Sequence, residues 1–159
     1  MNNKIKNVNG FTMMEFVVTL AIMGIIMSVT VPSFHRVRLE LQERQCVTNM
    51  NIISETFFQY FYQSHMNGNP HFPKTPNNEN HLMDNEWTNS PIDSLYNSFT
   101  TPKSLFSNGT VPKNMNQNPF AYETWKDTVQ STGEILYFIK IKDVDEDSPA
   151  FGKSLTHSI

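Results

Sequence analysis

The sequence predicts an α+β fold in which one long N-terminal helix packs on a small antiparallel β-sheet. Apolar residues follow helical spacing through much of the first 66 residues, and two segments near the C-terminus alternate as strands do. The 159 residues suit one domain of ordinary size once a membrane segment is set aside. We divide the chain into a basic leader (1–10), a transmembrane helix (11–34), an amphipathic helix (35–66) and a loop-rich head with a short sheet (67–159).

The composition excludes several classes of protein. The formal charge of −3 and the scattered Lys and Arg residues argue against a nucleic-acid-binding surface. Cys46 is the single cysteine, so no intramolecular disulfide can form and an exported head must be held by packing alone. We interpret Cys46 itself as a small buried residue of the helix. No catalytic motif is present, so the sequence predicts neither an enzyme nor a cofactor.

The N-terminus reads as a membrane segment with one unexpected charge. Residues 1–10 carry Lys4 and Lys6 and no acid, and from Phe11 to Val31 the only charge is Glu15. Twenty-one helical residues span about 31 Å, which matches the hydrocarbon core of a bilayer. A charge at membrane depth is costly and usually functional, so Glu15 requires an explanation.

Two ordinary interpretations of this segment leave features unexplained. A secretory signal peptide has a shorter apolar region and a small-residue cleavage site, and neither is found here. A plain signal anchor accounts for the length of the apolar run but gives Glu15 no role.

The string "GFTMME", from Gly10 to Glu15, resembles the prepilin-type cleavage and methylation motif of type IV pilins and type II secretion pseudopilins. The resemblance implies cleavage between Gly10 and Phe11 by a prepilin peptidase, followed by N-methylation of Phe11. A glycine suits such a cut because it lets an enzyme approach the backbone closely. The apolar helix would remain with the mature chain.

The resemblance also implies a partner for Glu15. In an assembled filament its carboxylate would neutralise the Phe11 amine of a neighbouring subunit, and it would thereby set the register of assembly. The alternative is that Glu15 lies at the headgroup boundary and reaches water.

Gly24 and Pro32 are expected to weaken the apolar helix, because glycine lowers helix stability and proline removes a backbone hydrogen bond. The resemblance implies that the segment between them becomes flexible on assembly, as it does in family members. A simple kink at Pro32 is the alternative.

The second helix and the sheet follow from spacing. The helix over residues 35–66 should stop at 67–70. An apolar stripe runs along it, made of Cys46, Met50, Ile53, Phe57, Tyr60 and Phe61. Segments 120–126 and 134–142 read as two strands joined by a hairpin loop. Ser90 is predicted to be the N-cap of a further short helix that begins at Pro91 and has Asp93 in its first turn.

The acidic segment "DVDEDS" has two interpretations. An acidic, solvated turn is preferred, so no metal site is predicted. The alternative is a calcium site at Asp143, Asp145 and Asp147, since major pseudopilins, which the chain resembles, often hold calcium near this end.

These observations predict a structural subunit of a pilus-like filament, in particular a pseudopilin of a type II secretion system. A type IV pilin or minor pilin is the alternative within the family, and a monomeric signal-anchored binding protein is the alternative of another class. The implied partners are the prepilin peptidase/methyltransferase, copies of this chain and other pilins or pseudopilins, and an inner-membrane assembly platform. The implied location is the bacterial cytoplasmic membrane, with a single span, the N-terminus cytoplasmic and the head exported.

Overall fold

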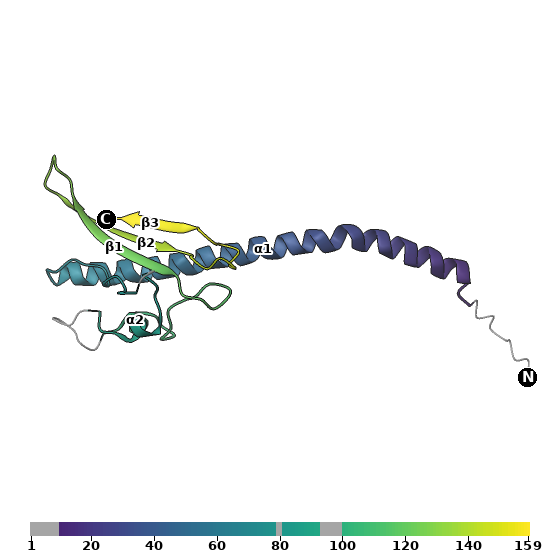
Figure 1. Cartoon of the computed structure of the whole chain (residues 1–159), viewed down its shortest axis with the longest axis horizontal. Helices are drawn as coiled ribbons and strands as arrows, with labels where there is room; N and C mark the ends of the chain where they lie inside the picture. Colours follow the sequence, from purple (N-terminus) through teal and green to yellow (C-terminus); the bar gives the residue numbers. More distant parts are fainter. Residues whose placement is uncertain (1–9, 79–80, 93–99) are drawn as a thin grey trace, which may run out of the picture. The chain divides into compact units, whose positions relative to one another are not determined.

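The computed structural model describes residues 10–78, 81–92 and 100–159. The chain divides into an N-terminal unit (Met1–Leu39) and a C-terminal unit (Glu40–Ile159), which we describe separately. Along the chain (Figure 1) the elements are α1 (Met13–Met66), α2 (Asn85–Asn89), the 3₁₀ helix η1 (Pro102–Leu105), β1 (Ala121–Thr128), β2 (Ile135–Lys142) and β3 (Ser154–Ser158). The predicted α+β class, with a long N-terminal helix and a small antiparallel sheet, is confirmed.

Helix α1 ends where the sequence predicts. Gly68 adopts a positive φ of 80°, which glycine tolerates without steric strain. Its N–H donates to the carbonyl of His65 at 3.0 Å, and the N–H of Asn69 donates to the carbonyl of Ser64 at 3.0 Å. These bonds satisfy carbonyls at the end of the helix that have no partner within it.

The N-terminal unit holds the first part of α1, whose apolar side chains are exposed on all sides. Hydroxyl groups in this stretch donate to helix carbonyls one turn earlier, as Thr30 does to Ile26 and Ser33 does to Val29. Thr19 and Ser28 do the same. The polar side chains of the apolar stretch are therefore satisfied within the helix, which is what a bilayer requires.

Helix α1 continues without a break through both Gly24 and Pro32. Pro32 has no N–H, so the carbonyl of Ser28 lacks its usual helical donor. The flexible segment between Gly24 and Pro32 stays a prediction.

The C-terminal unit is built on the second part of α1. Of the predicted stripe, Tyr60 is only half-buried and the others are buried: Cys46, Met50, Ile53, Phe57 and Phe61. Phe57 is fully buried at the centre of an aromatic cluster. Its ring centroid lies 5.1 Å from that of Tyr122 and 6.1 Å from those of Trp87 and Phe106.

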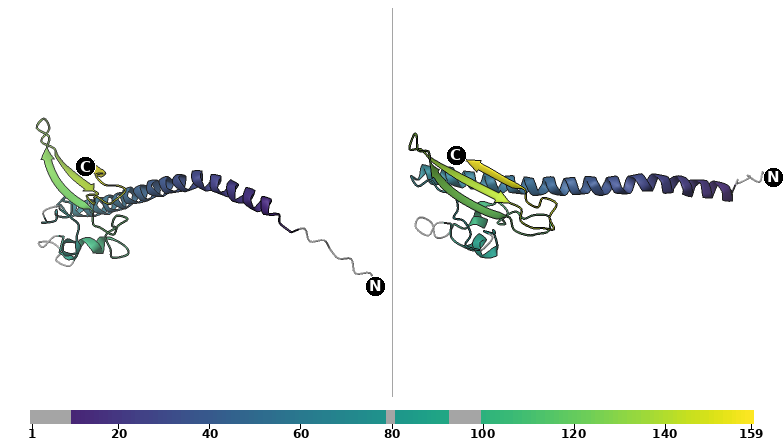
Figure 2. Two further views of the ribbon diagram at one scale, coloured as in Figure 1. Left: turned by 45° about the vertical axis from the view of Figure 1, so that its right-hand side comes forward. Right: turned by 45° about the horizontal axis from the view of Figure 1, so that its top comes forward.

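The sheet has the order β1-β2-β3 and is antiparallel throughout, as Figure 2 shows. Alternation along β2 predicts that Tyr137, Ile139 and Ile141 share one face, and this is confirmed: Ile139 and Ile141 are buried and Tyr137 packs against the core. The opposite face carries a stacked pair, Trp125 and Phe138, whose rings are 5.2 Å apart.

Two further elements differ from the sequence-based expectations. Strand β3 was not predicted, because "SLTHS" is short and mostly polar. Ser90 is the C-cap of α2 and not an N-cap: its N–H donates to the carbonyl of Trp87 at 3.1 Å. The prediction for Ser90 was therefore wrong, and Asp93 lies outside the described residues.

Candidate functional site

The site begins with an exposed stretch ahead of the helix. Gly10 and Phe11 have no regular secondary structure and are solvent-exposed, and the first helical residue is Met13. A side chain built on Gly10 would meet no heavy atom within 4 Å. The Gly10–Phe11 peptide bond is therefore accessible, and the fold itself places no steric limit on the residue at position 10.

Thr12 and Glu15 form a reciprocal cap on α1. The backbone N–H and the hydroxyl of Thr12 both donate to Oε2 of Glu15, each at 2.8 Å. In return the N–H of Glu15 donates to the Thr12 hydroxyl oxygen at 3.3 Å. This is a capping box, in which residues three apart satisfy each other's unpaired helix-terminal groups.

The capping box supplies a second role for Glu15 that the sequence reading did not consider. The signal was present, because Thr-x-x-Glu directly before an apolar run is the sequence signature of this cap. Glu15 also lies in the first turn of α1, where a negative charge interacts favourably with the positive end of the helix dipole. The carboxylate is thus held by its own helix in the isolated chain.

The helix that follows is long and apolar enough to cross a membrane by length and composition, and none of that apolar stretch is buried inside the structure. A soluble protein rarely exposes so large an apolar surface without a partner. A lipid phase or other apolar helices are the partners that such a surface fits.

The comparison with known families agrees with this geometry. The family described as the prokaryotic N-terminal methylation motif matches residues 5–31. Residues 5–31 are therefore a prepilin motif. No curated protein and no solved structure matches the chain.

The prepilin motif gives the residues described above a common context. It covers the exposed Gly10–Phe11 bond, the Thr12–Glu15 cap and the first turns of the apolar helix. It supports a type IV pilin-like protein. It also fits a protein anchored in a membrane by α1.

The acidic residues near the C-terminus lie in a different network. Oδ2 of Asp145 accepts hydrogen bonds from the side-chain amides of Asn114, Asn116 and Asn118, at 2.8, 2.8 and 2.9 Å. The bonds from Asn118 and Asn116, followed by that from Asn114, lower the pKa of Asp145. Asp143 is fully buried and accepts from the Ser148 hydroxyl at 2.6 Å.

This arrangement offers a cation few oxygen ligands, because Oδ2 of Asp145 already accepts three hydrogen bonds and Oδ1 of Asp143 accepts two. Both carboxylate oxygens of Asp143 and of Asp145 already accept hydrogen bonds. Within the part of the chain that the structure describes, no group of three or more His, Cys, Asp or Glu side chains is placed to hold a metal ion. A calcium ion needs six to eight oxygen ligands, so the residues as placed do not fit one.

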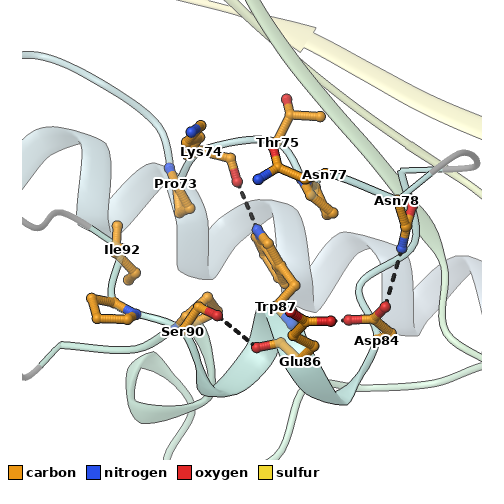
Figure 3. A pocket seen from close by; sticks show the side chains of 13 residues that line it. Pro73, Lys74, Thr75, Asn77, Asn78, Asp84, Glu86, Trp87, Ser90 and Ile92 are labelled. Carbon is orange, nitrogen blue, oxygen red and sulfur yellow. Dashed lines mark hydrogen bonds between the residues drawn. The ribbon is translucent and has the colours of Figure 1, made fainter.

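A pocket of about 330 Å³ lies beside α2, and the sequence reading did not predict it. Figure 3 shows Trp87 inside it, with the indole N–H donating to the carbonyl of Lys74 at 2.7 Å. Asn78 donates to Asp84, which in turn accepts from the backbone N–H of Trp87 as the N-cap of α2. Prolines 73, 76 and 102 of the lining are buried. These contacts serve the fold and identify no ligand.

Proposed function

We propose that this chain is a structural subunit of a pilus-like filament, in particular a pseudopilin of a type II secretion system. The observation that carries the proposal is a prepilin motif at residues 5–31 that leads into an exposed apolar helix. A prepilin peptidase cuts between Gly10 and Phe11, and the new amine of Phe11 is methylated. The helix anchors the subunit in the cytoplasmic membrane, with the N-terminus cytoplasmic and the C-terminal unit exported.

Assembly follows from the apolar surface of α1. Helices that leave the bilayer bury residues 11–34 against one another, and this keeps their apolar side chains out of water. Within such a bundle a lone Glu15 carboxylate is strongly disfavoured, whereas a carboxylate paired with the Phe11 amine of a neighbour is tolerated. Glu15 thereby selects subunits docked in the correct register. Gly24 and Pro32 give the helix the adaptability that packing demands.

Glu15 has to exchange partners for this mechanism to operate. In the isolated chain its carboxylate accepts two bonds from Thr12. A carboxylate has about four acceptor positions, so a neighbouring amine can approach while the bond from the Thr12 N–H is retained. The capping box therefore presents Glu15 at the helix start and does not sequester it.

A type IV pilin or minor pilin is the second candidate. Many pilins carry a disulfide near the C-terminus, and the single cysteine of this chain excludes one within the subunit. This absence favours a pseudopilin. Deleting the gene separates the two, since loss of a pseudopilin abolishes export of secreted proteins and loss of a pilin abolishes surface pili.

The first experiment is intact-mass measurement with N-terminal sequencing of the protein from native membranes. A chain that begins at N-methylated Phe11 supports the proposal. A chain that still begins at Met1 would leave a monomeric signal-anchored protein as the better account. A chain that begins beyond Pro32 would make it a secreted protein and overturn the proposal.

A further inference from the structure

Two loops of the C-terminal unit are joined by side-chain amides and carboxylates. The first loop precedes β1 and contributes Asn114, Asn116 and Asn118. The second loop connects β2 to β3 and contributes Asp143 and Asp145. We call these five residues the amide clasp. The three asparagines that donate to Asp145 precede it in the sequence by 27 to 31 positions.

The orientation of Asn114 is determined by its neighbours. Its Oδ1 accepts from the backbone N–H groups of Asn116 and Asn118, at 3.0 and 2.8 Å. Its Nδ2 must therefore face the acids, and it donates to Asp145 at 2.8 Å and to Asp143 at 3.4 Å. Asn114 is 2% exposed, so a flipped amide would leave its buried neighbours without hydrogen-bond partners.

The clasp is also tied to α1. Asn49 of the helix donates to the carbonyl of Lys113 at 2.7 Å, next to Asn114. Ser148, which donates to Asp143, places its Oγ 3.9 Å from Sγ of Cys46 on the helix. Lys153, near the start of β3, pairs with Glu43 of the helix. Each loop is thus held both to the other and to the helix.

An oxygen-rich set of Asp and Asn side chains is also what a calcium ion prefers, so the two alternatives can be compared directly. A cation would require oxygens to face Asp145, and Asn114 cannot supply one without breaking its two bonds to backbone N–H groups. Three side-chain amides already donate hydrogen bonds to Oδ2 of Asp145, the oxygen that a cation would bind.

We propose that the amide clasp fastens the two loops without a metal ion. Amide protons occupy the place of a cation, and the clasp is the cross-link that this chain has where a disulfide is impossible. Packing alone therefore does not hold the C-terminal unit. The inference does not depend on the assignment to a filament.

The experiment is thermal unfolding of the full-length chain in detergent, followed by near-ultraviolet circular dichroism, in a millimolar excess of either CaCl2 or EDTA. The wild-type midpoint is expected to be the same in both media, because a ligand that binds only the folded state would raise it. Asn116→Asp is expected to lower the midpoint by several degrees in EDTA, since it replaces an amide donor with a charge that repels Asp145. Asn108→Asp is the matched control: Asn108 is exposed and contacts Thr110 instead of the clasp.

A wild-type midpoint that rises by several degrees in CaCl2 would overturn the proposal, because the cluster would then be the empty form of a calcium site. Equal midpoints of Asn116→Asp and Asn108→Asp in EDTA would also overturn it, because Asn116 would then contribute no bond. Asn114→Ala should lower the midpoint equally in both media. If Asn114→Ala does not fold, the comparison of Asn116→Asp with Asn108→Asp still tests whether the clasp stabilises the protein.

Discussion

Oε2 of Glu15 accepts two hydrogen bonds from Thr12, one from the backbone N–H and one from the hydroxyl, both at 2.8 Å. The residue with the proposed intermolecular role is therefore also the residue that closes the start of its own helix. The two roles use different properties of the side chain: the cap requires an acceptor oxygen, whereas pairing with an amine requires a charge. Conservative substitutions can separate them.

Glu15→Gln is expected to block filament assembly as completely as Glu15→Ala. Glutamine keeps an acceptor for the Thr12 N–H, since capping boxes form with Glu or Gln, but it lacks the charge. Both variants should insert into the membrane normally. Assembly is measured as filaments sheared from cells, and insertion as the protein in the membrane fraction. Normal assembly of Glu15→Gln would show that the cap, and not the charge, is what assembly needs.

Thr12→Ala should weaken the helix start by about 1 kcal/mol, because the N-cap acceptor for the N–H of Glu15 is lost. Thr12→Ser keeps the hydroxyl and should behave as wild type. Amide hydrogen exchange of the first helical turn in detergent micelles measures the effect. Equal protection in Thr12→Ala and Thr12→Ser would refute the capping role of the hydroxyl.

Gly10→Val is expected to abolish cleavage without altering the fold. A Cβ at this position meets no heavy atom within 4 Å, so any loss of processing reflects the approach of the peptidase. Gly24→Val is the control, because Gly24 is equally open and lies beyond the cut. The mass of each membrane-extracted protein reports cleavage. A fully processed Gly10→Val chain would argue against recognition at this residue.

Phe57→Ala should destabilise the C-terminal unit by about 3–5 kcal/mol, the usual range for loss of a fully buried aromatic ring. The ring touches three others, so its removal leaves a cavity among them. Tyr62→Ala on the exposed side of the same helix should change stability by less than about 1 kcal/mol. Denaturant unfolding in detergent compares the two, and similar losses would contradict the assignment of the core.

The C-terminal unit should lose stability at alkaline pH through Tyr122. Burial raises the pKa of this phenol well above its ordinary value, and repulsion from Tyr60 adds to the shift. In the unfolded chain the phenol ionises near pH 10, so its contribution is complete below about pH 10 and falls as the pH rises further. Unfolding midpoints measured below and above about pH 10 test whether stability falls with rising pH.

Tyr122→Phe provides the comparison for that slope. The variant loses the hydrogen bond to the carbonyl of Pro73, which is 2.7 Å long, and should be about 1 kcal/mol less stable at neutral pH. Its stability should nevertheless depend less on alkaline pH than that of the wild type. Tyr62→Phe, which removes an exposed phenol, should retain the wild-type slope.

Several elements could be predicted because they have a period or a local signal. The buried stripe from Cys46 to Phe61 follows helical spacing, and the inward face of β2 follows alternation. The helix stop at Gly68 depends only on a backbone preference of glycine. The prepilin motif is equally local, since it lies within residues 5–31.

The elements that were missed depend on neighbours. Strand β3 is mostly polar and forms a strand because β2 offers it hydrogen bonds along Phe138–Lys142. Ser90 reads as an N-cap when it is followed by Pro91, but Asp84 had already started a helix that ends at Asn89. The N-cap signals at Asp84 and Ser90 compete, and packing favours the helix that starts after Asp84, because it places Trp87 against Phe57 and Tyr122.

By itself, the sequence determined the prepilin motif, the long apolar helix and the stripe on which the C-terminal unit folds. Each is encoded in contiguous residues, where hydrophobic transfer and helical period act without reference to the rest of the chain. Only the tertiary structure decided that Asn114 and Asp145, 31 residues apart, meet in the amide clasp. Asparagines and aspartates have no period, and their hydrogen bonds stabilise the protein only after folding has brought both loops out of water.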